Sequence, residues 1–406
     1  MTPPPVELLT VNLDVGSRRK VGRLAIRNRQ ILFEYDPQFL ASGIEISPFR
    51  LPLKPGVHVC PDQVFDGLHG VFNDSLPDGW GRLLLDRTVE KDGMNRRLLS
   101  SLDRLAWVGC QGMGALSYEP ELGGGECDQL PLSLEKLAGE AAIMLSGDSE
   151  TVFEELLQLN GSSSGARPKI VAQVSDDMAR IFHGQLKLQA GFSHWIVKFQ
   201  SGNDPRDIGA IEYAYSLMAR DAGVEMPETH LFRTRKQAWF GAKRFDRCGD
   251  RRVHMHSLSG LLHADHRTPA LDYDTLLRVA LVLTKNIINV EKAYALACFN
   301  VLAHNRDDHP KNFSFLLTER NEWVLSPAYD LTCSTGPGGE QSTMLLGEGR
   351  NPGIPHLIEL GRKHGLKTAP DILARVQAAI TRWPQHADQA GISRKSASSV
   401  EKHHAR

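Results

Sequence analysis

Hydrophobic and polar residues alternate along the beginning of the chain. The stretch KVGRLAIRNRQILFEYD at 20–36 shows this alternation, with turn signals at Gly22 and at Arg27–Gln30. Apolar residues at every second position are typical of strands that bury one face. The pattern therefore predicts a small β-rich unit from Val6 to about Val59.

Two breaks rich in glycine follow this unit. In NDSLPDGWGRLLLDR at 73–87, proline and glycine predict a tight turn, and a helix begins at Arg82. Taken alone, this turn indicates a structural cap. The run ELGGGECDQLP at 121–131 precedes a second helical pattern, so we predict a domain boundary near residue 128.

The rest of the chain changes from sheet to helix. We expect strands around 170–174, 194–200, 228–232 and 238–245, and a helix over 211–223. The pattern from His256 to Trp383 is mostly helical, with one hairpin at 313–325. The predicted fold is therefore α+β, with a β-rich N-terminal subdomain (1–128), a sheet-rich region with a glycine/serine loop (129–250), a helical lobe (251–395) and a flexible tail (396–406).

Composition and charge narrow the class of protein. The chain has 406 residues, 41% of them apolar and 23% charged, which is typical of a folded globular protein and excludes collagen, coiled coil and disorder. The net charge of −1 gives no electrostatic reason to expect direct binding to nucleic acid or to an acidic membrane.

The compartment is predicted from the N-terminus and the cysteines. The start, MTPPPVELL, lacks the pattern of a signal peptide, and the apolar runs are too short to span a bilayer. The six cysteines are scattered without a C-x-x-C pair, which indicates reduced thiols. We therefore expect a cytoplasmic protein without membrane insertion.

The densest polar cluster is AHNRDDHPKNFSFLL at 303–317. A phosphotransfer loop needs a carboxylate to orient the attacking hydroxyl and, five residues later, an amide oxygen to hold Mg²⁺. Asp307 and Asn312 have this spacing, whereas Asp308 does not and is expected to have a supporting or capping role. After the hairpin, SPAYDL places Asp330 at a strand end, where a second Mg²⁺ ligand is needed.

Two other interpretations of this cluster stay open. The run could be a solvated loop whose aspartates cap a helix. Alternatively, His304, Asp308 and His309 could bind Zn²⁺ or Fe²⁺, because imidazole and carboxylate groups suit transition metals.

The sheet-rich region supplies candidate groups for phosphate binding. Lys198 lies within the otherwise apolar strand HWIVKFQ, where a lysine must reach solvent or meet an anion. Glu212 opens the next helix and is either its ion-pair partner or a first-turn residue favoured by the helix dipole. The loop GSSSGARPK at 161–169 lacks both common phosphate-loop spacings, but its small residues allow backbone N–H groups to approach phosphate.

Together these strings resemble the HipA family of serine/threonine kinases, the toxins of bacterial HipA–HipB toxin–antitoxin pairs. The segments that carry the resemblance are SLPDGWGR (75–82), GMGAL (112–116), SSSGARPK (162–169), WIVKF (195–199), AKRFDR (242–247), HNRDDHPKNFSF (304–315) and SPAYDL (326–331). Their order and combination are far more specific than any one of them, and they imply a protein-kinase-like fold with two lobes.

The resemblance implies a role for each matching residue. Asp307 would be the catalytic base, Asn312 and Asp330 would bind Mg²⁺, and Lys198 would contact the phosphates of ATP. The backbone near Lys243 and Phe245 would read adenine. The other expected nucleotide-binding residues are Ser164, Gly165, Ala166, His309 and Lys311, with Glu212 and Asp308 in support.

The resemblance also implies regulation and partners. Autophosphorylation of Ser162, or of Ser163 or Ser164, would eject the loop and silence the kinase. The expected partners are a HipB-like helix-turn-helix antitoxin, DNA only through that antitoxin, and a protein substrate of the translation machinery, plausibly an aminoacyl-tRNA synthetase. The expected outcome is growth arrest and persistence. Two alternatives are a chain that acts mainly as a corepressor and a kinase for small molecules or lipid head groups.

Overall fold

A computed structural model describes residues 5–404, except 124–130, 147–155, 157–164, 166, 185–186, 203, 236, 266 and 268–270. The chain forms two compact units. The first contains residues 1–204, 242–256 and 260–263, and the second contains residues 205–241, 257–259 and 264–406. These units differ from the predicted divisions at 128 and 250, so the finer domain boundaries stay predictions.

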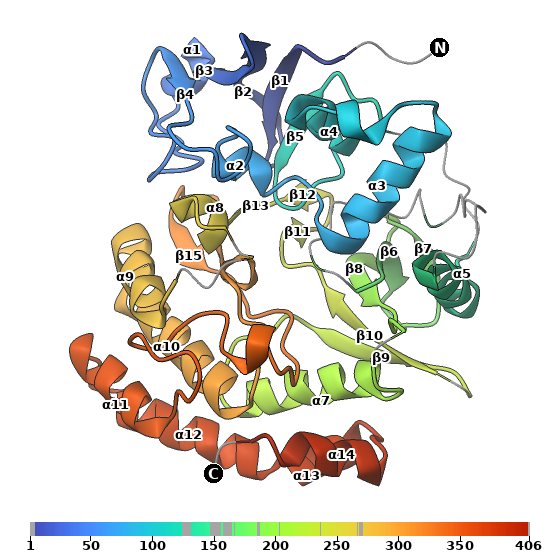
Figure 1. Ribbon diagram of the computed structural model, residues 1–406, viewed down its shortest axis with the longest axis vertical. Helices are drawn as coiled ribbons and strands as arrows, with labels where there is room; N and C mark the ends of the chain where they lie inside the picture. Colours follow the sequence, from blue (N-terminus) through green and yellow to red (C-terminus); the bar gives the residue numbers. More distant parts are fainter. Residues whose placement is uncertain are drawn as a thin grey trace. The chain divides into compact units, whose positions relative to one another are not determined.

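An antiparallel sheet opens the first unit, as the alternating pattern predicts (Figure 1). Its strand order is β4-β3-β2-β1-β5. The strands are β1 (Leu8–Asp14), β2 (Arg18–Arg27), β3 (Gln30–Tyr35), β4 (Val57–Val59) and β5 (Leu116–Glu119). The inward residues of β1, Leu9, Val11 and Leu13, are fully buried, and helix α4 (Ser101–Val108) packs against β1, β2 and β5. Burial of alternate apolar residues thus holds this sheet in its register.

A second group of strands in the first unit contains the predicted lysine strand. Strand β6 (Lys169–Ser175) pairs antiparallel with β7 (Ile181–His183) and with β8 (Phe192–Lys198). Every residue of β6 is buried, which is typical of a central strand. The remaining elements that lie entirely in this unit are α1 (Pro37–Leu40), α2 (Gly70–Asn73), α3 (Gly79–Lys91), η1 (Arg96–Leu98), α5 (Leu134–Ser146), β11 (Arg247–Cys248) and β12 (Arg251–Arg252).

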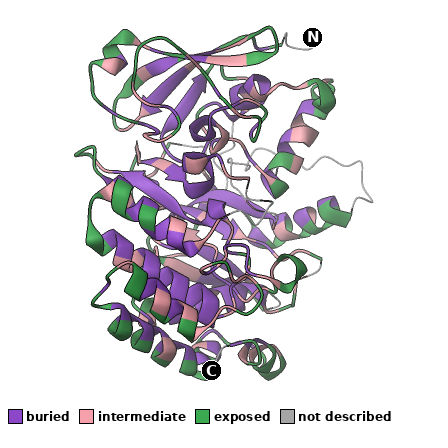
Figure 2. Ribbon diagram, turned by 60° about the vertical axis from the view of Figure 1, so that its left-hand side comes forward, coloured by how far each residue is buried: buried purple, intermediate pink, exposed green. Residues whose placement is uncertain are grey.

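The second unit is mainly helical and is organised around α10 (Ile287–Leu302). Twelve residues of this 16-residue helix are buried, so it is surrounded by other elements. Helices α9 (Tyr273–Thr284), α11 (Ile354–Lys363) and α12 (Ala369–Thr381) pack against it. In Figure 2 the helices near the C-terminus carry buried residues on one side and exposed residues on the other.

The other elements of the second unit follow the predicted order. Helix α7 (Ile208–Asp221) precedes β9 (Thr229–Arg233), which pairs with β10 (Ala238–Lys243), and the hairpin is formed by β14 (Ser314–Leu317) and β15 (Trp323–Leu325). The last two residues of β10 belong to the first unit, and β13 (His254–Ser257) and α8 (Leu258–Leu262) also have residues in both units. The short helices η2 (Pro310–Asn312) and η3 (Pro337–Gly339), and α13 (Trp383–Gln389), complete the list.

The C-terminal residues differ from the prediction. The sequence pattern predicts a flexible tail over 396–406, but residues Arg394–Glu401 form helix α14. The Ser393 side chain caps this helix by accepting a hydrogen bond from the Ser396 backbone N–H. His404 is buried and its ring lies 3.1 Å from the Tyr215 hydroxyl. A capped helix with a buried end is therefore part of the second unit.

Two expectations about the class of protein can be compared with the described residues. None of the helices described there combines the length and apolar character that crossing a bilayer requires. The five cysteines in that part of the chain, Cys60, Cys110, Cys248, Cys298 and Cys333, are all free thiols.

Candidate functional site

The polar run after α10 forms a loop that its own backbone contacts hold in place. His304 has a left-handed backbone (φ 55°), which turns the chain out of the helix. The Ser334 hydroxyl then accepts hydrogen bonds from the N–H groups of Arg306 (2.9 Å) and Asp307 (2.8 Å). The Asp307 side chain is left exposed at the surface of the second unit. Its carboxylate is therefore accessible to a reacting hydroxyl.

Asn312 is tied to Asp307 across the loop. Its side-chain N–H donates to the Asp307 carbonyl oxygen at 2.8 Å, which fixes the orientation of the amide. The side chain is buried, and Oδ1 has no hydrogen-bond partner in the described part of the chain. Buried polar atoms are nearly always paired, so this carbonyl oxygen is available to accept a ligand.

The buried side chain of Asp308 holds the loop in place through hydrogen bonds. Its buried carboxylate accepts hydrogen bonds from the Gln341 side chain (3.0 Å) and from the N–H groups of Ser342 (2.9 Å) and Thr343 (3.2 Å), and from the Tyr273 hydroxyl. Burial raises the pKa of Asp308 to about 7, against the effect of these donors. The geometry gives Asp308 a supporting contact within the second unit, which leaves Asp307 as the exposed carboxylate.

The remaining predicted residues of the second unit lie nearby in the chain but differ in exposure. Lys311 is buried, and its carbonyl oxygen accepts from the Tyr329 hydroxyl at 2.5 Å. His309 is half-buried and precedes the short helix η2. Asp330 is also half-buried. It does not lie at a strand end as expected, because β15 ends at Leu325, and its φ of 60° marks a tight backbone turn.

Glu212 lies deeper in its helix than the sequence pattern predicts. Helix α7 begins at Ile208, so Glu212 is in the second turn and the first-turn explanation of this residue is wrong. Its side chain is buried. Lys198, its expected partner, belongs to the first unit, and the ion pair stays a prediction.

The transition-metal interpretation of the polar run is not supported. His304, Asp308 and His309 do not form a ligand cluster, because the one group of three or more candidate ligands among the described residues lies elsewhere, in the first unit. The His304 ring instead stacks on the His403 ring, with centroids 4.8 Å apart. Burial of the Asp308 carboxylate against Tyr273 and Gln341 further removes it from any shared metal.

In the first unit, two lysines are opposite each other on paired strands. Lys198 is the last residue of β8 and pairs in register with Lys169 of β6. Directly opposite residues of an antiparallel pair lie on the same face, where like charges repel. Lys169 is buried and Lys198 is partly exposed, and the phosphate contact expected of Lys198 stays a prediction.

The turn at 75–82 has a contact that sequence analysis missed. The Asp78 carboxylate accepts a hydrogen bond from the Gly165 N–H, and the Gly165 carbonyl accepts from the Trp80 backbone N–H at 3.1 Å. The Trp80 indole also donates to the Lys169 carbonyl at 3.0 Å. The turn therefore anchors the end of the glycine/serine loop, and is more than the helix cap that its composition indicates.

The flanks of this loop are also restrained. Arg167 pairs with Asp204 at 3.2 Å, and both residues lie in the first unit. Gly165 has a φ of 103°, a backbone conformation that favours glycine. The predicted phosphosites Ser162, Ser163 and Ser164, and the predicted nucleotide-binding Ala166, lie outside the described residues.

The predicted adenine-reading segment contains Lys243 and Phe245, both half-buried. Between them, the Arg244 N–H donates to the His194 carbonyl at 2.8 Å, which joins the segment to β8. This N–H is therefore already engaged, and a purine would be read by the groups of the two flanking residues.

A buried charged cluster supports that segment. The fully buried Asp246 carboxylate pairs with Arg244 (2.7 Å) and Arg247 (2.8 Å) and accepts from the Gly114 N–H (2.8 Å). Burial alone would raise the pKa of Asp246, but the two arginines outweigh it and hold the pKa below its usual range. Two of the sequence motifs, at 112–116 and 242–247, thus meet in one network of the first unit.

Comparison with known proteins identifies the class. Residues 14–119 match the model of the HipA N-terminal domain, and residues 161–384 match that of the HipA-like C-terminal domain. The second match alone covers more than half of the chain. The protein therefore belongs to the HipA family, as the sequence motifs predict.

One curated relative shares part of the sequence. The chain is 28% identical over 236 residues to "Putative kinase Y4dM" of Sinorhizobium fredii (strain NBRC 101917 / NGR234), a match that spans 52% of this chain and 56% of that relative. The chain thus spans little more than half the length of this curated relative.

Solved structures show the fold. HipA in the toxin–antitoxin complex of Shewanella oneidensis MR-1 with HipB and operator DNA has a TM-score of 0.69 and 19% identity, over 97% of this chain and 94% of that chain. The predicted HipA-like fold of mixed helices and strands is therefore confirmed. The Helicobacter pylori proinflammatory kinase CtkA is more distant, with a TM-score of 0.38 and 14% identity over 59% of this chain and 86% of that chain.

Proposed function

We propose that the chain is an ATP-dependent serine/threonine protein kinase of the HipA type that works with Mg²⁺. The observation that carries this proposal is the hydrogen bonding of the Asn312 side chain. Its amide N–H binds the Asp307 carbonyl, and its buried Oδ1 has no hydrogen-bond partner among the described residues. An exposed carboxylate and a free amide oxygen five residues later are the two groups that a kinase catalytic loop requires.

The oxygen donors of the second unit fit a hard divalent cation. An amide oxygen from Asn312 and a carboxylate from Asp330 are ligands that Mg²⁺ prefers, and neither is a nitrogen or sulfur donor that would select zinc. When bound, Mg²⁺ neutralises the negative charge of the nucleotide phosphates.

Asp307 would serve as the catalytic base. As the serine oxygen bonds to the γ-phosphorus of ATP, the bond from that phosphorus to the bridging oxygen breaks and ADP leaves. The hydroxyl proton passes to the Asp307 carboxylate, which is exposed. The Asp307 backbone is held in place because its N–H donates a hydrogen bond to the Ser334 hydroxyl. Asp308 positions this loop and takes no proton from the substrate.

Candidate nucleotide contacts can be given for each unit by itself. In the first unit, Lys198 is the expected contact for the phosphates of ATP, and the anchored Gly165 backbone supports a phosphate-binding role for its loop. Further expected contacts come from Lys243 and Phe245 with adenine and from His309 and Lys311 with the nucleotide.

We extend this proposal to regulation by Ser162, with Ser163 and Ser164 as alternatives. A phosphate adds about −1.5 to −2 charges to a loop that must itself approach ATP phosphates, and this repulsion would expel the loop. Arg167, already paired with Asp204, would have to leave that partner to stabilise the expelled form.

The substrate and partner are part of the same proposal. The structural relative from Shewanella is in complex with HipB and operator DNA, which supports a HipB-like antitoxin partner and an indirect association with DNA. The proposed substrate is a cytoplasmic protein of the translation machinery, an aminoacyl-tRNA synthetase being the expected type, and its phosphorylation would arrest growth.

Nucleotide binding tests the observation that carries the proposal. Isothermal titration should show Mg²⁺-dependent binding of ATP by the full chain, and Asn312→Ala should abolish the dependence on Mg²⁺. The exposed Asn351→Ala should behave as wild type. Mg²⁺-dependent binding that persists in Asn312→Ala would contradict the assigned ligand.

Mass mapping after incubation with Mg-ATP tests the regulatory part. We expect one phosphate on Ser162, Ser163 or Ser164 and weaker ATP binding by the phosphorylated chain. Phosphate found only outside residues 161–169, with unchanged ATP binding, would exclude self-inactivation through this loop.

A further inference from the structure

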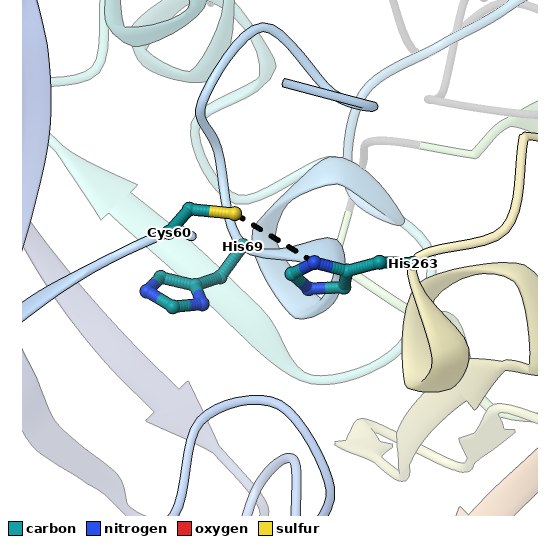
Figure 3. A group of neighbouring side chains, drawn as sticks. All are labelled: Cys60, His69 and His263. Atoms are coloured by element: carbon teal, nitrogen blue, oxygen red, sulfur yellow. Dashed lines mark hydrogen bonds between the residues drawn. The ribbon is translucent and has the colours of Figure 1, made fainter. Parts of the chain in front are cut away.

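Three potential metal ligands that the proposed function does not use meet inside the first unit (Figure 3). Cys60 and His69 lie close together in sequence, whereas His263 comes from a distant segment, and the ligand atoms of all three lie within 4.8 Å of one another. All three side chains are buried, with exposed fractions of 5%, 3% and 6%. A thiol and two imidazoles at this separation form a ligand set typical of Zn²⁺.

His69 is the member of the cluster whose ring nitrogens lack hydrogen bonds among the described residues. Neither of its ring nitrogens has a hydrogen-bond partner in the part of the chain that the structure describes. Since a buried imidazole normally pairs its nitrogens, the unpaired ring here points to a missing ligand.

The distances agree with tetrahedral zinc. The Cys60 Sγ lies 3.6 Å from the His263 Nδ1. Bonds of about 2.3 Å to sulfur and about 2.0 Å to nitrogen, at a tetrahedral angle, give a ligand–ligand distance of about 3.5 Å, close to the one observed.

Asp62 lies beside the cluster and contacts two of its members. Its Oδ2 lies 2.9 Å from the His263 Nδ1, and its Oδ1 lies 3.7 Å from the Cys60 Sγ. The Asp62 side chain is 31% exposed, which gives an ion a route into the cluster. A thiolate and a carboxylate together carry two negative charges and so balance a divalent cation.

We propose that Cys60, His69, His263 and Asp62 form a structural Zn²⁺ site. Four protein ligands leave no position for a substrate, so the metal would hold the fold together and would not take part in catalysis. The site would connect the segment that follows β4 and the start of α2 to the turn that contains His263.

Binding moves two protons. The Cys60 thiol loses its proton to solvent, because the thiolate is the ligand. The His263 Nδ1, which now faces Asp62, must give up any proton it carries, and the ring then carries its proton on Nε2. That nitrogen now accepts from the Gly70 N–H at 3.0 Å, so metal binding replaces this backbone hydrogen bond. Metal binding therefore breaks one hydrogen bond that the metal-free form makes.

Cobalt spectroscopy of the full chain tests the site, because Co²⁺ replaces Zn²⁺ and is coloured. Wild type stripped of metal should bind one Co²⁺ with intense tetrahedral bands and a thiolate charge-transfer band, both removed by Zn²⁺. Cys60→Ser should lose the charge-transfer band, and His69→Gln should keep it but bind about tenfold or more weakly. The control Cys298→Ser, at a buried cysteine of the second unit, should match wild type.

Two results would overturn the site. One is a pale octahedral spectrum in wild type, and the other is a charge-transfer band that survives in Cys60→Ser. Alkylation of wild type is the companion measurement, because it needs no variant to fold: Zn²⁺ should protect Cys60 and leave the exposed Cys248 reactive. Equal reactivity of Cys60 with and without Zn²⁺ would also exclude the proposal.

Discussion

Asp307 and Asp308 are neighbours in the chain, but their carboxyl groups have opposite surroundings. Asp307 is exposed, whereas Asp308 is fully buried and accepts hydrogen bonds from Tyr273, Gln341 and two backbone N–H groups. An exposed carboxylate can be replaced without loss of packing, while a buried one leaves its donors unpaired. Substitution of Asp307 should therefore affect the reaction, whereas substitution of Asp308 should affect the stability of the fold.

Asp308→Ala should lower the free energy of unfolding by about 3 kcal/mol or more, because each unpaired buried donor costs about 1–3 kcal/mol. Asp307→Ala should change it by less than about 0.5 kcal/mol, as is usual for an exposed side chain. Urea unfolding followed by circular dichroism measures both. Equal stability of the two variants would show that the buried network contributes little.

Spacing could single out Asp307 and Asn312 because the chemistry of a catalytic loop is local in sequence. The partners of Asp308 could not be predicted in this way, since Tyr273 and Gln341 lie more than 30 residues from it. Long-range contacts of this kind depend on the packing of α9 and of the segment before α11, which no local pattern encodes.

The turn at 75–82 shows how one element positions another. Asp78 precedes α3 at the N-cap position but makes no side-chain cap hydrogen bond, and its carboxylate instead accepts from the Gly165 N–H. The turn residues alone could predict a helix start. They could not predict a contact with a residue 87 positions away.

Asp78→Asn should weaken ATP binding by about tenfold, because a charged hydrogen bond contributes about 1.5–3 kcal/mol and the amide restores only part of it. The thermal midpoint should change little. Asp92→Asn, at the exposed end of the same helix, is the matched control and should bind ATP like wild type. Identical ATP affinity in the two variants would remove the role assigned to this turn.

Helix α14 is the element that the sequence pattern predicts wrongly. Its residues are mostly small and polar, and only Val400 among them is buried. The sequence therefore has no apolar stripe that would predict a helix here. The helix depends on the Ser393 cap and on tertiary contacts, including the hydrogen bond from the Trp383 indole to the Ala397 carbonyl at 3.0 Å.

Removal of residues 394–406 should therefore lower the thermal midpoint by about 5 °C or more, since about 2–4 °C corresponds to 1 kcal/mol in a unit of this size. The loss would come from the Trp383 contact and from the burial of Val400 and His404. Differential scanning calorimetry of the shortened chain measures it. An unchanged midpoint would show that these residues contribute nothing to stability, as a frayed tail would.

At the scale of the whole molecule, buried neutral histidines link stability to pH. Burial lowers the pKa of His254 and His404 to about 4, while the unfolded chain binds these protons near pH 6.5. Between these values the unfolded state carries more protons, so stability falls as the pH falls. Each such histidine contributes about 1.4 kcal/mol per pH unit.

The thermal midpoint should therefore be highest above about pH 6.5 and should fall between about pH 6 and pH 4. His404→Gln, which keeps a polar group near the Tyr215 hydroxyl, should make this fall shallower. A midpoint that does not change over this range, or a slope that the substitution does not alter, would contradict the assignment of neutral buried rings.

The division into two units was not predictable from local patterns. Residues 242–256 return to the first unit because the buried Asp246 binds the Gly114 N–H and two arginines, a network formed by segments 132 positions apart. The family, in contrast, could be predicted from the sequence, because its motifs are short, ordered along the chain and rich in residues that packing alone does not require.

The most direct test of the central claim is transfer of radiolabel from [γ-³²P]ATP to protein in whole-cell lysate and to the chain itself. Wild type with Mg²⁺ should label one or a few lysate proteins, and Asp307→Ala, with an unchanged thermal midpoint, should lose the signal by several orders of magnitude. Labelling that persists in a folded Asp307→Ala protein would contradict the account of this chain as a kinase with Asp307 as its base.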